Sequence, residues 1–296
     1  MYKKIILFLL LILSLSAFQI WTDKDRIADV QAITGQAVAI ADGEKRILTR
    51  DSKLYVKEVL AVGEKSFLQV IFRDGTVLSM EENTEVELRQ FAFDAWDDEN
   101  NLVDFNMIAG GMRFLTGKVT KNNPEAFSFE TPLGTIGIRG TEGTTDTELA
   151  NDEQYSQSLN MSINASTTTW SHAVAPEVTR QTTQHVDGDV NRVMTFSDLF
   201  GKTVSMARGE EVVISSTTGT NDPRLITPIG REDTKPTRFK AFVSIPKDVR
   251  AHFPGFAGGG RYTPGTGGGD GALTPSSSNS SSSGGGGSVG SPTNGP

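Results

Sequence analysis

The sequence contains no cysteine and only three histidines among its 296 residues. Without cysteine the chain can form neither a disulfide nor a thiolate metal site, and it cannot carry a lipid on a cleavage-site cysteine. The motif H-E-x-x-H is also missing, and G-x-S-x-G occurs only within the Gly/Ser-rich stretch at residues 286–290, where no strand–turn–helix context is expected. Neither serine-hydrolase nor zinc-protease chemistry therefore has a convincing local signature. Carboxylate pairs are common in this acidic chain and leave glycosidase chemistry open. We nevertheless predict a protein that is not an enzyme and that needs no cofactor.

Long apolar runs are scarce, and the longest one lies at the start of the chain, at residues 5–13. Lys3 and Lys4 precede this run and small residues follow it, which is the order of a secretory signal peptide. We therefore predict a signal peptide at residues 1–17, cleaved after Ser16 or Ala17. A membrane span needs about 20 residues, so an uncleaved anchor that continues to residue 21 is the alternative.

The charge distribution bears on nucleic-acid binding, and the C-terminal composition bears on folding of the last 80 residues. The net charge is −8 and the Lys and Arg residues are scattered rather than clustered, which argues against a nucleic-acid partner. Residues 257–296 hold 14 of the 31 glycines together with long serine runs, a composition that predicts a disordered tail. Residues 217–256 form an extension interrupted by prolines, with a short helix predicted where Pro246 can occupy the first helical position.

The central part of the chain has the alternation of apolar and polar residues that is typical of half-buried strands. It is clear in TEVELRQ, in LVDFNMI, and around Ser128 and Gly137. The pairs Asp42-Gly43 and Asp74-Gly75 separate such segments and indicate tight hairpin turns. We predict an all-β fold of many short antiparallel strands and hairpins, with a sandwich, an irregular barrel and a short solenoid as possible architectures.

The segment at about 142–185 is rich in Thr, Ser and Gln and poor in large apolar residues. We interpret it as a polar insertion or a long hairpin, in which SLNMSINAS and TTTWSHAV form edge strands.

The stretch TPLGTIGIRGTEGT, residues 131–144, has a glycine at every third position. It lacks the Lys of a phosphate-binding P-loop, and no amphipathic helix follows it, as a dinucleotide site requires. Glycines within a strand pattern instead mark bulges, tight bends or the close approach of another backbone.

The order of motifs from residue 35 to residue 216 resembles the FecR-domain family. The segments that carry the resemblance are GQAVAIADGEKRIL, SFLQVIFRDGTVLSMEENTEVEL, AGGMRFLTGKV, TPLGTIGIRGT and VDGDVNRVMTF with GKTVSMARGEEVVI. The resemblance implies a FecR-like β-domain at 30–216 that is exposed to the cell envelope and binds or relays without catalysis. It further implies that the TPLGTIGIRGT residues are structural, namely Thr131, Pro132, Gly134, Gly137, Arg139, Gly140 and Thr141. The family's namesake carries a cytoplasmic sigma-factor-binding segment ahead of a membrane helix, whereas here only residues 1–4 precede the apolar run.

Two candidate binding sites come from the residues themselves. Arg139 could contact a carboxylate or phosphate ligand, but an internal role beside the turn is the favoured interpretation. Asp187, Asp189 and Asn191 follow a loose calcium-loop spacing, yet Arg192 stands where the loop needs glycine and the final bidentate Glu is missing. We therefore predict a turn at this position and no metal site.

Together these patterns predict an exported protein of a Gram-negative bacterium, located in the periplasm or at the cell surface. It would act as a binding, scaffolding or signalling module for an envelope protein or polysaccharide partner. Two alternatives are a signal relay anchored in the membrane by an uncleaved N-terminal segment, and a carbohydrate- or peptidoglycan-binding module.

Overall fold

The computed structural model describes residues 26–96, 99–138, 140–188 and 193–225. The chain divides into two units, Met1–Gly259 and Gly260–Pro296, and all described residues belong to the first. The predicted signal peptide, the short helix near Pro246 and the Gly/Ser-rich tail lie outside the described residues.

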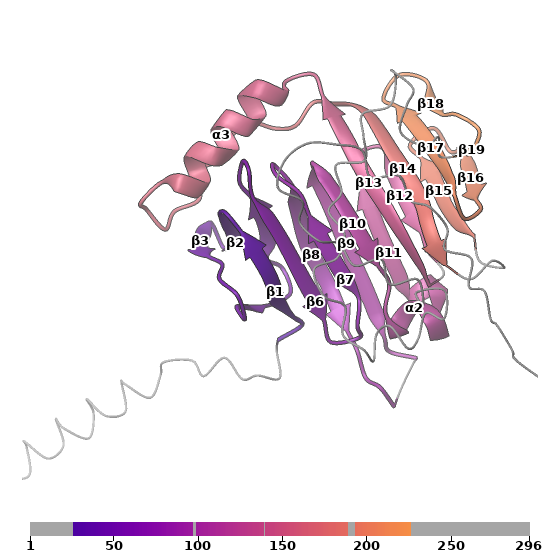
Figure 1. Ribbon diagram of the computed structural model, residues 1–296, viewed down its shortest axis with the longest axis horizontal. Coiled ribbons are helices and arrows are strands. Elements are labelled where there is room, and N and C mark those ends of the chain that lie inside the picture. Colours follow the sequence, from indigo (N-terminus) through magenta and orange to yellow (C-terminus); the bar gives the residue numbers. More distant parts are fainter. Residues whose placement is uncertain (1–25, 97–98, 139, 189–192, 226–296) are drawn as a thin grey trace, which may run out of the picture. The chain divides into compact units, whose positions relative to one another are not determined.

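The described residues form two large β-sheets, which we call sheet A and sheet B (Figure 1). Sheet A contains, in spatial order, β18 (Gly219–Thr220), β17 (Glu210–Ser215), β14 (Val178–Gly188), β13 (Thr141–Leu149), β10 (Gly111–Leu115), β7 (Val77–Met80), β6 (Phe67–Phe72), β1 (Ala28–Thr34) and β4 (Lys53–Leu54), with β19 (Arg224–Leu225) also paired to β17. Sheet B contains β16 (Thr203–Met206), β15 (Met194–Asp198), β12 (Gly134–Gly137), β11 (Phe127–Thr131), β9 (Leu102–Ala109), β8 (Glu85–Ala92), β5 (Val59–Val62), β2 (Ala37–Ala41) and β3 (Glu44–Ile47). The helical elements are α2 (Lys118–Asn122), the 3-10 turn η2 (Pro124–Ala126) and α3 (Asp152–Asn164).

The chain passes repeatedly from one sheet to the other, and each passage adds strands next to those already placed. Sheet A therefore grows in the order β6, β7, β10, β13, β14, β17, while sheet B grows from β5 through β8, β9, β11, β12 and β15 to β16. The β9–β11 pair is parallel and the other strand pairs are antiparallel. The all-β prediction is confirmed, and the architecture is a two-layer sandwich with the progressive strand order of a solenoid.

The core lies between the two sheets and is built by the predicted alternation. Val103, Phe105 and Met107 on β9 are buried with exposures of at most 1%, while the residues between them face outward. Rings from opposite sheets meet in this layer, since the Phe105 and Phe72 centroids are 4.7 Å apart. Burial of such aromatic and aliphatic side chains is the main stabilising contribution in a fold of this kind.

The predicted Asp42-Gly43 turn is present and joins β2 to β3 through two residues. Both residues have positive φ, 52° and 77° respectively, which is the backbone of the hairpin turn that matches strand twist. The pair was therefore a reliable local signal.

The polar segment at about 142–185 contains two inner strands of sheet A. β13 pairs with β10 on one side and with β14 on the other, so of the two interpretations the long hairpin describes it. The expectation of an edge strand at SLNMSINAS is wrong, because these residues form most of helix α3. TTTWSHAV contributes only an isolated bridge between Thr169 and Glu44.

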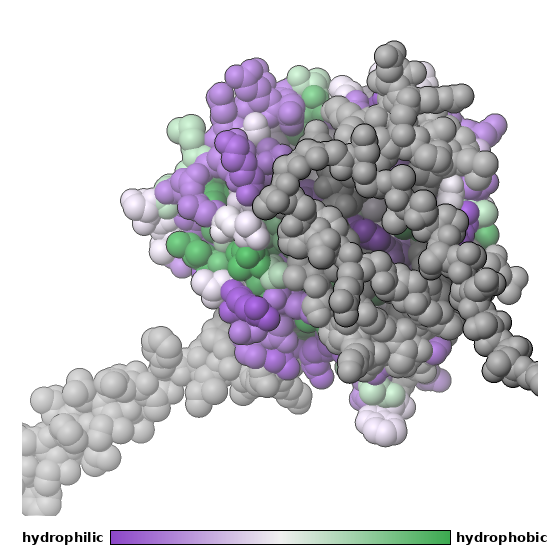
Figure 2. Space-filling view, viewed as in Figure 1, coloured by the Kyte–Doolittle hydropathy of each residue, from purple (hydrophilic) through white to green (hydrophobic). Residues whose placement is uncertain are grey.

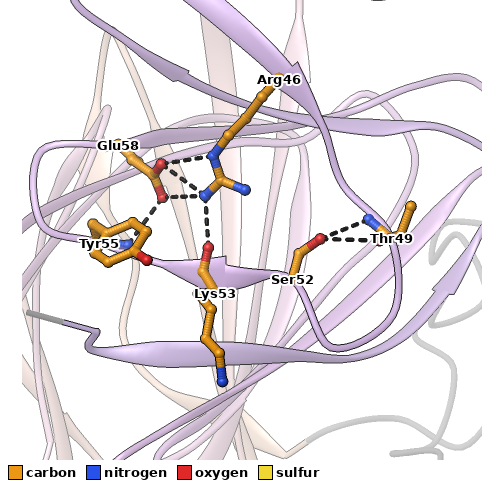
Figure 3. A network of polar contacts seen from close by, with 6 residues as sticks. All are labelled: Arg46, Thr49, Ser52, Lys53, Tyr55 and Glu58. Atoms are coloured by element: carbon orange, nitrogen blue, oxygen red, sulfur yellow. Dashed lines mark hydrogen bonds and ion pairs between the residues drawn. The ribbon is translucent and has the colours of Figure 1, made fainter. Parts of the chain in front are cut away.

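A polar network fixes the loop between β3 and β5 (Figure 3). The Arg46 guanidinium donates to both carboxylate oxygens of Glu58, at 2.7 and 2.9 Å, and to the carbonyl oxygen of Lys53 at 2.6 Å. Glu58 also accepts a hydrogen bond from the backbone N–H of Tyr55 at 2.9 Å. A bidentate Arg–carboxylate pair of this kind adds geometric definition as well as energy, and it holds the β2–β3 end of sheet B in place.

Candidate functional site: the outer face of sheet B

The outer face of sheet B consists of two parts with different surroundings. The first, which we call the capped half, lies on β2, β5 and the adjoining ends of β8 and β9, and helix α3 covers it. The second, the open half, extends over β8, β9, β11, β12, β15 and β16 and consists of polar residues. The two halves offer different chemistry.

Helix α3 packs onto the capped half through a narrow apolar stripe. Tyr155, Leu159 and Ile163 are four residues apart and therefore lie on one face of the helix, and all three are buried. They form a small second core with residues that point away from the main one, namely Val38, Ile40, Ala61 and Ala109. The remaining face of α3 is mostly hydrophilic, with Met161 as an exposed apolar side chain on it; Figure 2 shows the hydrophilic surface at its upper left.

A buried polar cluster lies beneath this helix. The Tyr155 hydroxyl donates a hydrogen bond to Oε2 of Glu85, and His172 Nε2 lies 3.5 Å from the same oxygen. On its other side the His172 ring has Nδ1 3.1 Å from the Ser158 hydroxyl, and it packs edge-on against Tyr155 at 5.1 Å between centroids. Glu85 is only 3% exposed.

Burial controls the ionisation of this cluster. It raises the pKa of Glu85, an effect that the hydrogen bond from Tyr155 partly opposes. It also raises the pKa of Tyr155, and the neighbouring Glu85 carboxylate adds to that rise. For His172, burial lowers the pKa, so the ring is neutral at pH 7. Each shift follows from the cost of placing a charge away from water.

Lys45 on β3 anchors the C-terminal end of α3. Its ammonium group donates to the carbonyl oxygens of Ser162, Ile163 and Ala165, the last two at 2.9 and 2.8 Å. The last carbonyls of a helix lack intrahelical partners and carry partial negative charge. The lysine ammonium group provides hydrogen-bond donors for these carbonyls and a positive charge opposite theirs.

The segment after α3 covers the edge of sheet B at β3. Lys45 N–H donates to the Thr168 carbonyl at 2.6 Å, and Trp170 N–H donates to the Gly43 carbonyl at 2.8 Å. The backbone N–H of Lys45 and the carbonyl of Gly43 at this edge are therefore paired within the chain. Asn160 makes a further contact, accepting a hydrogen bond from Glu64 N–H at 2.6 Å.

The open half is a regular array of polar side chains in cross-strand register. One row crosses six strands and consists of Glu87, Asn106, Glu130, Thr135, Ser197 and Thr203. A second row consists of Asp104, Ser128, Gly137, Thr195 and Ser205. Such an array can make many hydrogen bonds to a partner but offers no large apolar contact.

The charges of the open half lie at its β8–β9–β11 end. Arg89 forms ion pairs with Glu87 and Glu130, and Asn106 donates to Glu87 at 3.3 Å. Partial burial raises the pKa of Asp104, and the nearby Arg89 opposes the rise. Toward β15 and β16 the face carries only Ser and Thr.

The TPLGTIGIRGT motif forms the β11–β12 hairpin and then the passage from sheet B to sheet A. A Cβ atom on Gly134 would clash with the Ser197 carbonyl oxygen, and one on Gly137 would clash with the Thr195 hydroxyl. Gly140 has φ +70°, and the Thr131 hydroxyl donates to the Gly134 carbonyl at 2.7 Å. The glycines thus allow the close approach of β15 and the bend between sheets.

The two candidate binding sites from the sequence fall mostly outside the described residues. Arg139, Asp189 and Asn191 lie outside the described residues. Asp187 lies on β14 opposite Glu142. Among the described ranges, no group of three or more His, Asp or Glu side chains has the arrangement to hold a metal ion.

Sequence reasoning missed the cluster and its supports, which are Glu85, Tyr155, His172 and Lys45. The available signal was the spacing of Tyr155, Leu159 and Ile163 by four residues, preceded by Asp152 and Glu153, which favour a helix N-terminus. The surrounding residues are mostly polar, so the three apolar positions did not indicate a helix clearly.

Comparison with known proteins agrees with the motif order described above. The model of the family described as FecR protein matches residues 58–159. Residues 58–159 form a FecR domain. Within the fold this FecR domain runs from the start of β5 into α3, so it includes Glu85 and Tyr155 as well as the TPLGTIGIRGT motif. No curated protein matches the chain.

Two solved structures are similar to the chain at low identity. Both are crystal structures of an anti-sigma factor candidate from Parabacteroides distasonis ATCC 8503, at 1.65 and 2.50 Å resolution. Each is 12% identical with a TM-score of 0.36, and the alignment covers 56% of this chain and 59% of the other. The chain thus spans a little more than half the length of those proteins.

In the part of the chain that the structure describes, no helix is both long and apolar enough to cross a membrane.

Proposed function

We propose that this protein is a non-catalytic signalling or scaffolding module of the bacterial cell envelope, exported and acting by binding a protein partner. The observation that carries the proposal is the FecR match over residues 58–159, which includes β5 of the capped half and four of the six strands of the open half, β8, β9, β11 and β12. The TPLGTIGIRGT motif has a structural role in this account, because its glycines permit backbone approach rather than ligand contact.

The open half of sheet B is the proposed binding surface. Its side chains are in register across six strands and reach solvent, with Glu130, Thr135, Thr203 and Ser205 the most exposed. The Arg89–Glu130 ion pair adds charge that can select a partner and orient it. The capped half is not part of the proposed surface, because helix α3 covers its side chains. It lies next to the open half in the same sheet.

A non-catalytic role also agrees with the chemistry of the buried cluster. Glu85 is hydrogen-bonded to Tyr155 beneath α3, the His172 ring packs against Tyr155, and Glu85 and Tyr155 are at most 3% exposed. The Glu85 carboxylate accepts the hydrogen bond of the Tyr155 hydroxyl, and Tyr155 belongs to the small second core beneath α3. In the described part of the chain, the cluster does not line a cleft. A substrate therefore has no path to the Glu85 carboxylate without displacement of the helix. We assign the cluster the role of holding the helix in place.

Site-specific photo-crosslinking in the producing cell tests the proposal. A photoreactive residue at Thr135, in the centre of the open half, is expected to give one dominant protein adduct in the envelope fraction. The control position is Lys65, whose side chain is 86% exposed in a turn away from this face. A single protein adduct at Thr135 that is absent at Lys65 supports the binding surface, and Glu130→Lys should reduce its yield. Equal adduct patterns at both positions, or none at Thr135, would contradict it.

A further inference from the structure

The two edges of sheet B differ in how their backbone groups are paired. At the β3 edge the chain's own segment at Thr168 and Trp170 pairs with the backbone of the β2–β3 hairpin. At the β16 edge, β15 is the only strand that pairs with β16 among residues 26–96, 99–138, 140–188 and 193–225. An unpaired edge is a template for adding another strand.

The direction of the backbone groups on β16 follows from its pairing with β15. Asp198 N–H donates to the Lys202 carbonyl, so hydrogen-bonded pairs alternate from there along the ladder and include Phe196 with Val204. Thr203 and Ser205 occupy the intervening positions, and their N–H and C=O groups point away from β15. Both residues are exposed.

Among the described residues, β16 is protected by its short length but by none of the other usual edge devices. Its four residues are Thr203, Val204, Ser205 and Met206, without proline or charge. The adjacent Lys202 is directed elsewhere, because its ammonium group donates to the Thr220 carbonyl at 2.9 Å and to Asp222 at 3.0 Å. Native sheets commonly place lysine, proline or a bulge at an edge to prevent pairing.

We propose that β16 is a dimerisation edge, at which a second copy of this chain adds its own β16 in antiparallel orientation. The β16 register favours this occupant. With a two-fold axis at Val204, Thr203 of each copy lies opposite Ser205 of the other and exchanges two hydrogen bonds with it, giving four in total. A shift of the register in either direction leaves half of these outward groups unpaired.

The side chains are compatible with the same arrangement. Thr203 and Ser205 of the two copies lie opposite each other on the polar face, where hydroxyl pairs stabilise a sheet. Val204 meets its counterpart on the inner face. The contact is short, so the dimer forms at high protein concentration and dissociates on dilution. The proposal concerns an edge of the sheet and is independent of the partner bound by the open half.

A single cysteine tests the register, because the natural chain has none. Val204 and its counterpart form a non-hydrogen-bonded pair, with Cα atoms about 4.5 Å apart, which is within the range that a disulfide bridges. Under mild oxidation the purified V204C chain should become a covalent dimer of twice the mass on a non-reducing gel. The matched control is I47C, which places an exposed thiol on β3, the strand at the opposite edge of sheet B, and should remain monomeric.

Sedimentation of the full chain provides an independent readout. The wild-type sedimentation coefficient should rise with concentration, and S205P should remain monomeric over the same range. Proline removes an outward N–H that the sheet itself does not use, so S205P should retain the far-ultraviolet circular dichroism of the wild type. T203A changes only a side chain and should still dimerise.

A wild-type chain that is monomeric at all concentrations would overturn the proposal, as would a dimer that V204C fails to trap. If the pure chain is monomeric while Ser205→Pro abolishes complex formation in cells, the edge accepts a strand of another protein, and the second-copy proposal is wrong.

Discussion

At the scale of single residues, the least expected feature is a carboxyl group buried beneath a helix. Glu85 lies on an outward-facing position of β8, yet it is almost fully covered because Tyr155, His172 and the rest of the cap close over it. Burying a carboxyl group is costly unless it is hydrogen-bonded or neutral. The Tyr155 hydroxyl and the raised pKa of Glu85 meet these two conditions.

The first prediction concerns the hydroxyl of Tyr155. Tyr155→Phe keeps the ring but leaves the Glu85 carboxyl without its donor, and the free energy of unfolding should fall by about 1–3 kcal/mol. Urea denaturation measures this. In a double-mutant cycle with Glu85→Ala the two losses should not add, because both substitutions remove the same contact. Simple additivity would contradict the contact.

The second prediction concerns pH. Because the pKa of Glu85 is raised in the folded protein, the folded state keeps the proton to higher pH than the unfolded chain does. The contribution of Glu85 to the free energy of unfolding is therefore largest below its ordinary pKa of about 4.3 and falls as pH rises through the folded pKa.

Glutamine does not titrate, so the stability of the wild type relative to Glu85→Gln should decrease as pH rises from 4 to 7. His172, with its lowered pKa, has the opposite effect and contributes less as pH falls below about 6.5, but it is present in both proteins. Urea titrations at several pH values give the comparison, and a stability difference that is constant with pH would refute the buried position of Glu85.

The third prediction concerns Gly134. Gly134→Ala introduces a Cβ against the Ser197 carbonyl and the Phe196 ring, so β12 and β15 must separate, and the cost should be about 1–3 kcal/mol. Thr135→Ala is the neighbouring control and should change stability by about 0.5 kcal/mol or less, since Thr135 is exposed. Equal thermal shifts for the two variants would mean that the glycine is not required there.

At the scale of elements, helix α3 and the segment that follows it form a cap attached at several points. Its apolar stripe is only three residues long, and its C-terminal end depends on Lys45. A 13-residue helix with so few apolar positions would not be stable alone in water. Its stability therefore comes from the sheet.

The fourth prediction follows from this dependence. Lys45→Met removes the donor for three helix carbonyls while keeping most of the aliphatic chain, so amide hydrogen exchange should accelerate in α3 more than in β8 or β9. Local opening of a weakly held element is expected before global unfolding. Lys65→Met, at an exposed lysine, is the control and should leave exchange in α3 unchanged; equal acceleration in the sheet would contradict a local anchor.

The comparison of sequence and structure is also clearest at this scale. Strands such as β8, β9 and β11 could be predicted because each buries one face, which leaves a period of two in the sequence. Helix α3 could not, because most of its surface is hydrophilic and only Tyr155, Leu159 and Ile163 record the buried side. The glycines of the motif leave a local pattern that predicts backbone positions, whereas the pairing of Glu85 with Tyr155 joins residues 70 positions apart and leaves no local pattern.

At the scale of the whole molecule, the progressive sandwich gives one continuous core between its two sheets and leaves two outer sheet faces. Strands far apart in sequence, such as β8 and β15, lie in one sheet because each passage between layers adds to the same end. This construction produces the long register of polar side chains on the open half. A surface of this kind fits a binding or relay role, and the FecR domain contributes four of its six strands and the first part of helix α3.

The central claim is that the protein acts outside the cytoplasm as a binding module. The most direct test is mass spectrometry of the N-terminus of the chain isolated from fractionated cells. We predict a chain that begins near Ala17 or Phe18 and is found in the periplasmic or extracellular fraction. An intact Met1 in the membrane fraction would favour the anchored relay, and an intact Met1 in the cytoplasmic fraction would contradict the account.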